Sequence, residues 1–193
     1  MKKRNLSAKK KIHNYLIKKL KNIKIKDFFF NFEKFLKNNY NKKICIAISG
    51  GPDSMALAYL SKLYSLKKKK IKFFYYTVDH KLRNESSKEA KQLKSVLKKF
   101  DINCKILTWK GKKPSKNIQS IAREKRYQLL FRECKKNNID SILTAHHQDD
   151  LFENFFIRIL RGSGLKGLIS FSKLITKINK SSNIYILRPL LNF

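Results

Sequence analysis

A pair of glycines lies between a short apolar run and an amphipathic one, in the segment Ser49-Gly50-Gly51-Pro52-Asp53-Ser54. The run 44–48 before it predicts a buried strand, and the run 55–63 after it has apolar residues at helical spacing. The segment is therefore expected to be a strand-to-helix turn. Glycines let the backbone approach an anion closely, and the first turn of a helix supplies unpaired amides.

The six residues of this turn are all candidates for a phosphate-binding loop. Pro52 suits the start of a helix, where its missing N–H costs little. Asp53 is a candidate to hold Mg²⁺, which prefers oxygen ligands, or to orient the loop. No Gly-Lys-Ser/Thr follows, so this is not the Walker pattern. The plain alternative is a tight turn with a helix cap, which six such residues in this context disfavour.

Strands and helices are expected to alternate along the rest of the chain. Strands are expected at 44–48, 71–78, 102–109, 140–144 and 184–187, and helices from the glycine turn to 66 and at 86–100, 117–136 and 149–160. This alternation predicts an α/β fold, a parallel sheet with helices on both faces. Ligands of such sheets bind beyond the carboxyl ends of the strands. Asp79, His80 and His146 follow two of the strands, so we expect them to share one site with the glycine turn.

Charge points to a polyanionic partner. The chain has 193 residues and a net charge of +33, with 38 lysines and 8 arginines. Such a surface attracts nucleic acid, although an AT-rich genome would also enrich lysine, so we assign that bias about half of the charge. Residues 1–26 are expected to form a basic arm, either helical or disordered, and 27–193 one domain. Asp27 is a candidate cap for the next helix.

The cysteines indicate a reducing compartment. Cys45, Cys104 and Cys134 are far apart and form no C-x-x-C pair, so we expect reduced, structural thiols. No apolar stretch approaches the ~20 residues that span a bilayer, and the basic N-terminus lacks the apolar core of a signal peptide. A cytoplasmic protein is expected.

Five segments, taken in order, resemble the N-terminal catalytic domain of the tRNA(Ile)-lysidine synthetase family. They are 49–54, 78–86, 117–127 with its Ala122-Arg123 and Arg126-Tyr127 pairs, 144–153 with His146-His147 and Asp149-Asp150, and 158–167 with the closing Arg188-Pro189-Leu190-Leu191. The glycine loop alone indicates only the wider ATP-pyrophosphatase group. The resemblance implies an adenine nucleotide alpha hydrolase-like, Rossmann-like fold over about residues 43–191.

The resemblance also implies a reaction and its partners. Enzymes of that family use ATP to adenylate the wobble cytidine of an isoleucine tRNA with a CAU anticodon, and then join L-lysine to form lysidine, releasing AMP and pyrophosphate. ATP, Mg²⁺, L-lysine and tRNA are therefore the expected ligands. The expected catalytic residues are Asp53, Arg123, Asp150 and Glu153, and Asp79 and His146 are expected to join the loop in binding ATP.

The acidic helix and the arginines have ordinary alternatives. Asp149 and Asp150 could simply favour a helix N-terminus, although Glu153 shares a face with both and could complete a pocket for an ammonium group or Mg²⁺. Arg126 could belong to a solvated basic face. The family usually has Gln and Thr where this chain has Leu151 and Asn154, which leaves the details of this helix open.

Three other functions compete with a tRNA-modifying ligase. Thiolation enzymes share the ATP chemistry but normally carry catalytic cysteines, often as C-x-x-C. Amidating synthetases share the loop but not the segments at 78–86 and 158–191. A basic tRNA-binding remnant without activity would not need Asp53, Ser54 and the acidic helix. Family members usually continue beyond the catalytic domain, so the chain is either a fragment or a shortened enzyme.

Overall fold

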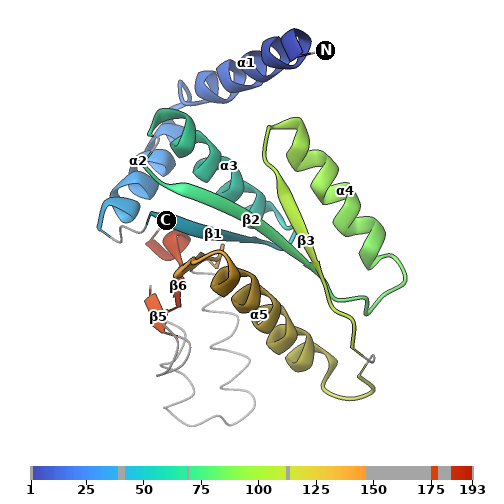
Figure 1. Ribbon diagram of the computed structural model, residues 1–193. Helices are drawn as coiled ribbons and strands as arrows, with labels where there is room; N and C mark the ends of the chain where they lie inside the picture. The colour runs from blue at the N-terminus through green and yellow to red at the C-terminus, as the bar shows by residue number, and fades with distance from the viewer. Residues whose placement is uncertain are drawn as a thin grey trace.

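The structure, a computed structural model, has a twisted six-stranded sheet at its centre (Figure 1). It describes residues 2–38, 42–68, 70–111, 114–146, 175–177 and 184–192. The strand order is β3-β2-β1-β4-β6-β5. All neighbouring strands pair in parallel except β5, which runs antiparallel to β6.

The sheet and its helices closely follow the expected alternation. The strands are β1 (Lys43–Ile48), β2 (Lys72–Asp79), β3 (Cys104–Thr108), β4 (Ser141–Leu143), β5 (Ile175–Lys177) and β6 (Tyr185–Leu187). The helices are α1 (Lys2–Lys19), α2 (Ile23–Asn38), α3 (Pro52–Lys67), α4 (Ser86–Lys99), α5 (Ile118–Lys136) and the 3₁₀ helix η1 (Pro189–Asn192).

Helices cover both faces of the sheet. The strand β1 sends alternate side chains to opposite faces, so it contributes to the packing on each. Ile44, Ile46 and Ile48 pack with α2 and α3 in one cluster of buried residues. Cys45 belongs to a second cluster, with Cys134 of α5. A buried strand with apolar residues on both faces is typical of a parallel sheet, so the predicted α/β fold with helices on both faces is confirmed.

The N-terminal residues form two helices. α1 is helical, one of the two alternatives expected for the basic arm, and its Leu16 is buried in the core cluster with α2 and α3. α2 begins at Ile23, so the prediction that Asp27 caps this helix is wrong. Apolar residues such as Ile25 and Phe29 continue the buried face of α2 through this position and extend it before Asp27. The division of the chain at residue 26 remains a prediction.

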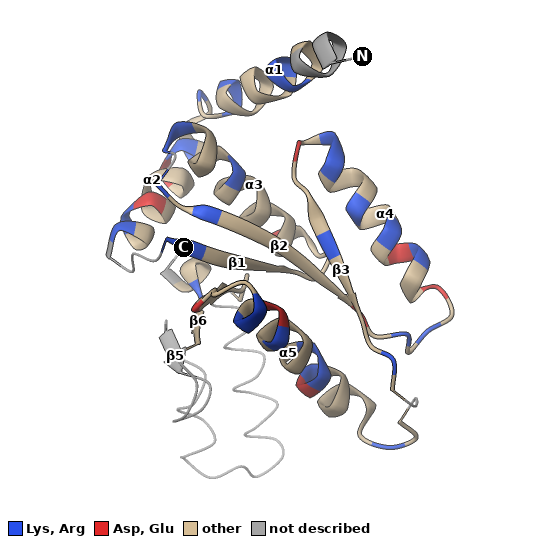
Figure 2. Ribbon diagram, viewed as in Figure 1, with Lys and Arg blue, Asp and Glu red and all other residues tan. Residues whose placement is uncertain are grey.

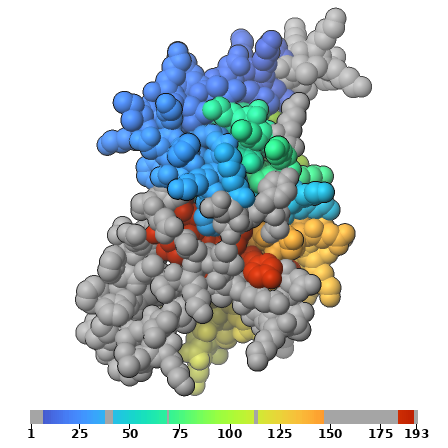
Figure 3. Space-filling view, turned by 90° about the vertical axis from the view of Figure 1, so that its left-hand side faces the viewer, coloured from blue at the N-terminus to red at the C-terminus, as the bar shows by residue number. Residues whose placement is uncertain are grey.

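The end of the chain returns to the centre of the fold. β6 pairs with β4, and η1 packs against α2. The space-filling view shows these last residues below α2 on the same side of the molecule (Figure 3). The short antiparallel strand β5 was not expected. Among the described helices, none combines the length and apolar character needed to cross a membrane.

Candidate nucleotide-binding site

The loop between β1 and α3 is closed by a side chain from the helix that it precedes. The Ser54 hydroxyl accepts hydrogen bonds from the amides of Ser49 (3.2 Å) and Gly50 (3.1 Å) and donates one to the Gly51 carbonyl (2.9 Å). The Ser49 hydroxyl lies 3.2 Å from the same oxygen. Ser54 is buried, so its hydroxyl shapes the loop from within.

The two glycines have different conformations. Gly50 has φ +96°, in the region that glycine adopts far more readily than other residues. Gly51 has an ordinary extended backbone at the N-cap of α3, and Pro52 follows in the first turn as predicted. The first hydrogen bond of α3 runs from the Met55 amide to the Gly51 carbonyl, so the amides before Met55 have no partner within the helix. This helix start can receive an anion.

A cavity of about 950 Å³ opens on this loop. Its wall includes the ends of β1, β2 and β4 and the first turns of α3 and α4. The predicted residues that line it are Ser49, Gly50, Gly51, Asp53, Ser54, Asp79, His80, Arg126 and His146. The structure thus brings the polar residues that follow these strands to one cavity. In the sheet, β2 and β3 lie on one side of β1 and β4 on the other, so the strand order reverses at β1, and ligands of α/β sheets bind at such a point.

Asp79 organises the connection from β2 to α4. Its Oδ1 accepts hydrogen bonds from the Lys81 amide (3.0 Å) and the Ser86 hydroxyl (2.8 Å), and its Oδ2 accepts one from the Ser87 hydroxyl (2.6 Å). Burial opposes ionisation, but these hydrogen bonds outweigh it and lower the pKa of Asp79. Lys81 has φ +51°, a left-handed conformation next to this carboxylate. Asp79 thus holds the first turn of α4 against the cavity.

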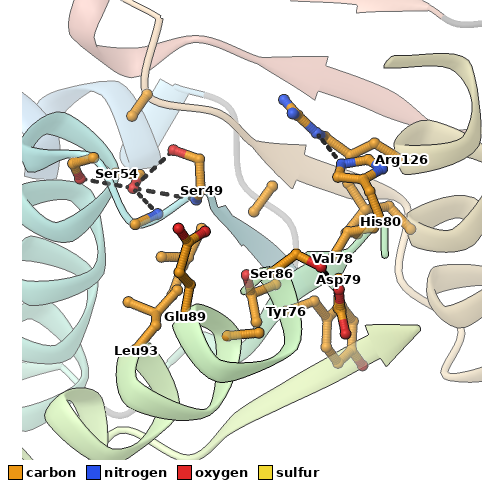
Figure 4. A pocket seen from close by; sticks show the side chains of 18 of the residues that line it. Ser49, Ser54, Tyr76, Val78, Asp79, His80, Ser86, Glu89, Leu93 and Arg126 are labelled. Atoms are coloured by element: carbon orange, nitrogen blue, oxygen red, sulfur yellow. Dashed lines mark hydrogen bonds between the residues drawn. The ribbon is translucent and has the colours of Figure 1, made fainter. Parts of the chain in front are cut away.

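His80 and Arg126 line the side of the cavity that lies across from the glycine loop (Figure 4). The Nε of Arg126 donates to Nε2 of His80 over 3.4 Å, an arrangement that requires an unprotonated Nε2. Burial and the positive charge of Arg126 lower the pKa of His80, and Asp79 opposes them only in part. The imidazole is therefore neutral at physiological pH.

Three arginines gather beside this wall. Burial lowers the pKa values of Arg126 and Arg188, and the positive charge of Arg123 lowers both further. Arg123 also lies over the ring of Tyr127, with its guanidinium carbon 5.8 Å from the ring centroid. Arginine stays protonated despite such shifts. Three close cations form a region where a phosphate group would be favoured.

Two further residues of the cavity were given no role in the sequence analysis. Thr144 is buried at the end of β4, and its hydroxyl lies 2.9 Å from Nδ1 of His146. Glu89 extends from α4 toward the glycine loop (Figure 4) and pairs with Arg83, whose Nη2 is 3.1 Å from Oε2. Glu89 lies one turn after Ser86, so the helical period could have placed both on the face of α4 that borders the site.

Several predicted residues cannot be placed. Asp150 and Glu153, the helix expected at 149–160, and the segment 158–167 lie outside the described residues. Among the residues that are described, no group of three or more His, Cys, Asp or Glu side chains could hold a metal ion.

The fold is of the class that α/β nucleotide-binding proteins share, and its cavity opens on a glycine turn at a helix N-terminus. A family model described as the PP-loop domain matches residues 25–193. The chain belongs to this PP-loop family.

Curated relatives of the chain within this family include proteins named tRNA(Ile)-lysidine synthase. The chain is 42% identical over 166 residues to a tRNA(Ile)-lysidine synthase of Orientia tsutsugamushi, covering 86% of this chain and 36% of that protein. It is 38% identical over 165 residues to a protein of the same name from Rickettsia rickettsii, covering 86% of this chain and 33% of the relative. The chain thus spans about a third of the length of these relatives.

Solved structures share the fold. A U34-tRNA thiolase, NcsA from Methanococcus maripaludis, described with its [4Fe-4S] cluster, superimposes with a TM-score of 0.71 at 21% identity, over 86% of this chain and 59% of that one. The FMN adenylyltransferase of Candida glabrata, in complex with FMN and an ATP analogue, gives a TM-score of 0.53 at 16% identity, over 95% and 60%. At these identities the likeness concerns the fold alone.

Proposed function

We propose that this chain is the catalytic domain of a tRNA(Ile)-lysidine synthase. The observation that carries the proposal is the 42% identity to a curated protein of that name over 86% of the chain, a stretch that includes most of the residues lining the cavity. The substrates would be ATP, L-lysine and an isoleucine tRNA with a CAU anticodon, which occur together in the cytoplasm.

The reaction has two steps. In the first, the C2 oxygen of the wobble cytidine attacks the α-phosphorus of ATP and pyrophosphate leaves. In the second, the lysine ε-amine attacks C2, and the oxygen leaves with AMP while the amine loses its proton. The first step needs stabilisation of negative charge on the leaving pyrophosphate, which amides, cations and Mg²⁺ supply.

The described residues fit the ATP half of this scheme. The cavity volume of about 950 Å³ is at the upper end of the range for small-molecule sites. We assign the pyrophosphate group to the glycine loop and the start of α3, with His146 beside it. Arg123, Arg126 and Arg188 would neutralise the phosphates or the adenylated intermediate. Asp79 would hold α4 against the bound nucleotide, because both of its carboxylate oxygens accept hydrogen bonds from the start of that helix or the turn before it.

Mg²⁺ would be held by Asp53 together with phosphate oxygens of the nucleotide. Asp53 lines the cavity in the first turn of α3, and Mg²⁺ is usually bound through one or two carboxylates plus substrate phosphates. When bound, the ion would supply positive charge to the leaving pyrophosphate. Asp150 and Glu153 stay our candidates for the lysine ammonium group.

Thiolation is the alternative reaction, since the thiolase NcsA shows that the same fold can carry it. The cysteines of this chain argue against it. Cys45 and Cys134 pack in one core cluster and Cys104 in the other, each at most 1% exposed. A thiol that carries sulfur or ligates a cluster would have to leave the core.

The assay that tests the proposal measures transfer of labelled L-lysine to a transcript of the CAU-anticodon isoleucine tRNA, with ATP and Mg²⁺ present. A transcript with uridine at the wobble position is the matched control. Incorporation that requires the wobble cytidine would establish the function. Adenylylation of the cytidine without lysine transfer would support the first step alone. If neither product forms, the proposal is rejected and thiolation and amidation become the leading alternatives.

A further inference from the structure

Helix α1 precedes the part of the chain that matches the PP-loop family; it is rich in lysine and contains no acidic residue. Residues 2–26 contain ten lysines, one arginine and no aspartate or glutamate. Most of this stretch precedes residue 25, where the family match begins. Like charges a turn apart weaken an isolated helix, so α1 depends on contacts with the rest of the protein.

One acidic residue provides much of that attachment. Asp101 lies in the turn between α4 and β3, and its carboxylate contacts two α1 residues, with Nε2 of His13 at 3.0 Å and Nζ of Lys9 at 3.3 Å. Lys62 of α3 donates to the same carboxylate over 2.8 Å. Leu16 completes the contact by inserting into the core. α1 is thus fixed to α3 and to the end of α4.

With Leu16 buried, the opposite side of α1, which carries lysines, is exposed to solvent. Lys11 and Lys18 are exposed and lie two turns apart on the side of α1 opposite Leu16. Tyr15 is 52% exposed beside them, and the Lys19 ammonium group lies 5.1 Å from its ring centroid. Because α1 is docked, these cations are held in place relative to the sheet.

Helix α4 connects this face to the cavity. Its first turns line the cavity through Ser86, Glu89 and Leu93, and the turn that follows its last residue contains Asp101. The helix has 14 residues and therefore spans roughly 20 Å. Lys88, Lys91 and Lys98 are exposed along it, and Figure 2 shows basic residues on both α1 and α4.

We propose that these lysines form one RNA-binding surface, the α1–α4 basic surface, made of Lys11, Lys18, Lys19, Lys88, Lys91 and Lys98. It would bind the phosphate backbone of the tRNA whose reacting nucleotide enters the cavity, and so it rests on the proposed function. Lysine binds phosphate as a point charge, independently of base sequence. Tyr15 adds an aromatic ring on which an unpaired base can stack.

The test is the salt dependence of tRNA binding by the full chain. One variant carries Lys11→Gln and Lys18→Gln and a second carries Lys91→Gln and Lys98→Gln. The matched control carries Lys135→Gln and Lys136→Gln at the exposed end of α5, which changes the net charge equally. Each phosphate contact adds about 0.7–0.9 to the slope of log K against log salt concentration. Each surface variant should lose about twice that amount, and the control should keep the wild-type slope.

Binding is measured without ATP or lysine, and thermal melts establish that the variants fold. Equal slopes in the surface variants and the control would overturn the proposal, even if the protein transfers lysine to tRNA. A reduced slope only in the surface variants would support the surface. If the same protein then failed to modify tRNA, the proposed reaction would be rejected and the RNA-binding surface retained.

Discussion

The Ser54 hydroxyl lies 3.1 Å from the amide nitrogen of Gly50, so a side chain in the first turn of α3 fixes the loop from which that helix starts. The amide can point there because Gly50 has φ +96°. Two loop amides are thus used to hold the loop in shape, and the start of α3 remains to receive an anion. Preorganisation of this kind lowers the entropy lost when a ligand binds.

Alanine at the two glycines should give different results. Gly50→Ala forces a side chain into a left-handed backbone and should lower the free energy of unfolding by about 1–2 kcal/mol. At Gly51 an added Cβ would meet Ser49 Oγ at 3.7 Å, an ordinary contact, so Gly51→Ala is the matched control. Urea denaturation of both variants measures the difference. A Gly51 variant as unstable as the Gly50 variant would contradict this account of the loop.

Asp53→Ala should separate chemistry from RNA binding. If Asp53 holds the metal on the nucleotide, release of pyrophosphate should fall by about 100-fold or more, as for other lost electrostatic groups in active sites. The salt-sensitive binding of tRNA should remain. Asp27→Ala, at an exposed position of α2, is the control of the same residue type. Parallel loss of pyrophosphate release and RNA binding would indicate instead that Asp53 is structural.

His80 should make the protein more stable as the pH rises from acidic values. Its pKa is lower in the folded state than the ordinary 6.5, so the unfolded chain binds the proton more readily. Stability is therefore lost as the pH falls below about 6.5 and is fully present above it. His80→Gln should remove this part of the pH dependence, measured as the free energy of unfolding across the acidic range. An NMR titration midpoint of His80 above 6.5 would contradict the neutral imidazole assigned here.

Asp101 should control the docking of α1. Burial opposes its ionisation, but hydrogen bonds from Lys62, His13 and Lys9 lower its pKa to about 2. Its contribution to stability should be present above about pH 4 and lost as the pH falls toward 2. Asp101→Asn should cost about 1.5–3 kcal/mol, the range for hydrogen bonds to charged groups. Limited trypsin digestion should then cut at Lys10 and Lys11 sooner than in the wild type. An unchanged cleavage rate would show that apolar packing alone holds the helix.

The sequence predicted the elements whose signals are local. The apolar run at β1, the glycine turn and the start of α3 were correct because strand burial, turn chemistry and the proline position all agree. The three-residue antiparallel strand β5 was missed, since so short a segment has no usable periodicity. The start of α2 was misplaced because Asp27 has the character of a cap but lies on the exposed side of a helix that begins at Ile23.

The sequence predicted that residues following several strands would lie close together. It did not predict the contacts that these residues make with one another and with the rest of the fold. That Asp79 binds ATP stays a prediction, whereas the hydrogen bonds that its oxygens accept from Lys81, Ser86 and Ser87 had no signal in the sequence. The role of Asp101 depends on His13, 88 positions away, and nothing local announces such a contact. Arg188 belongs to a segment used only for the resemblance, and its burial beside Arg123 emerged from the fold.

The burial of Cys45, Cys104 and Cys134 has a practical consequence. Burial raises the pKa of the Cys104 thiol to about 11 and that of Cys45 well above its usual range, so neither presents a reactive thiolate to solvent at neutral pH. Thiol reagents should reach these sulfurs only in molecules whose core has opened. The rate of labelling would then act as a clock for unfolding, and a cysteine introduced on the surface would carry a fluorophore without removal of the native ones.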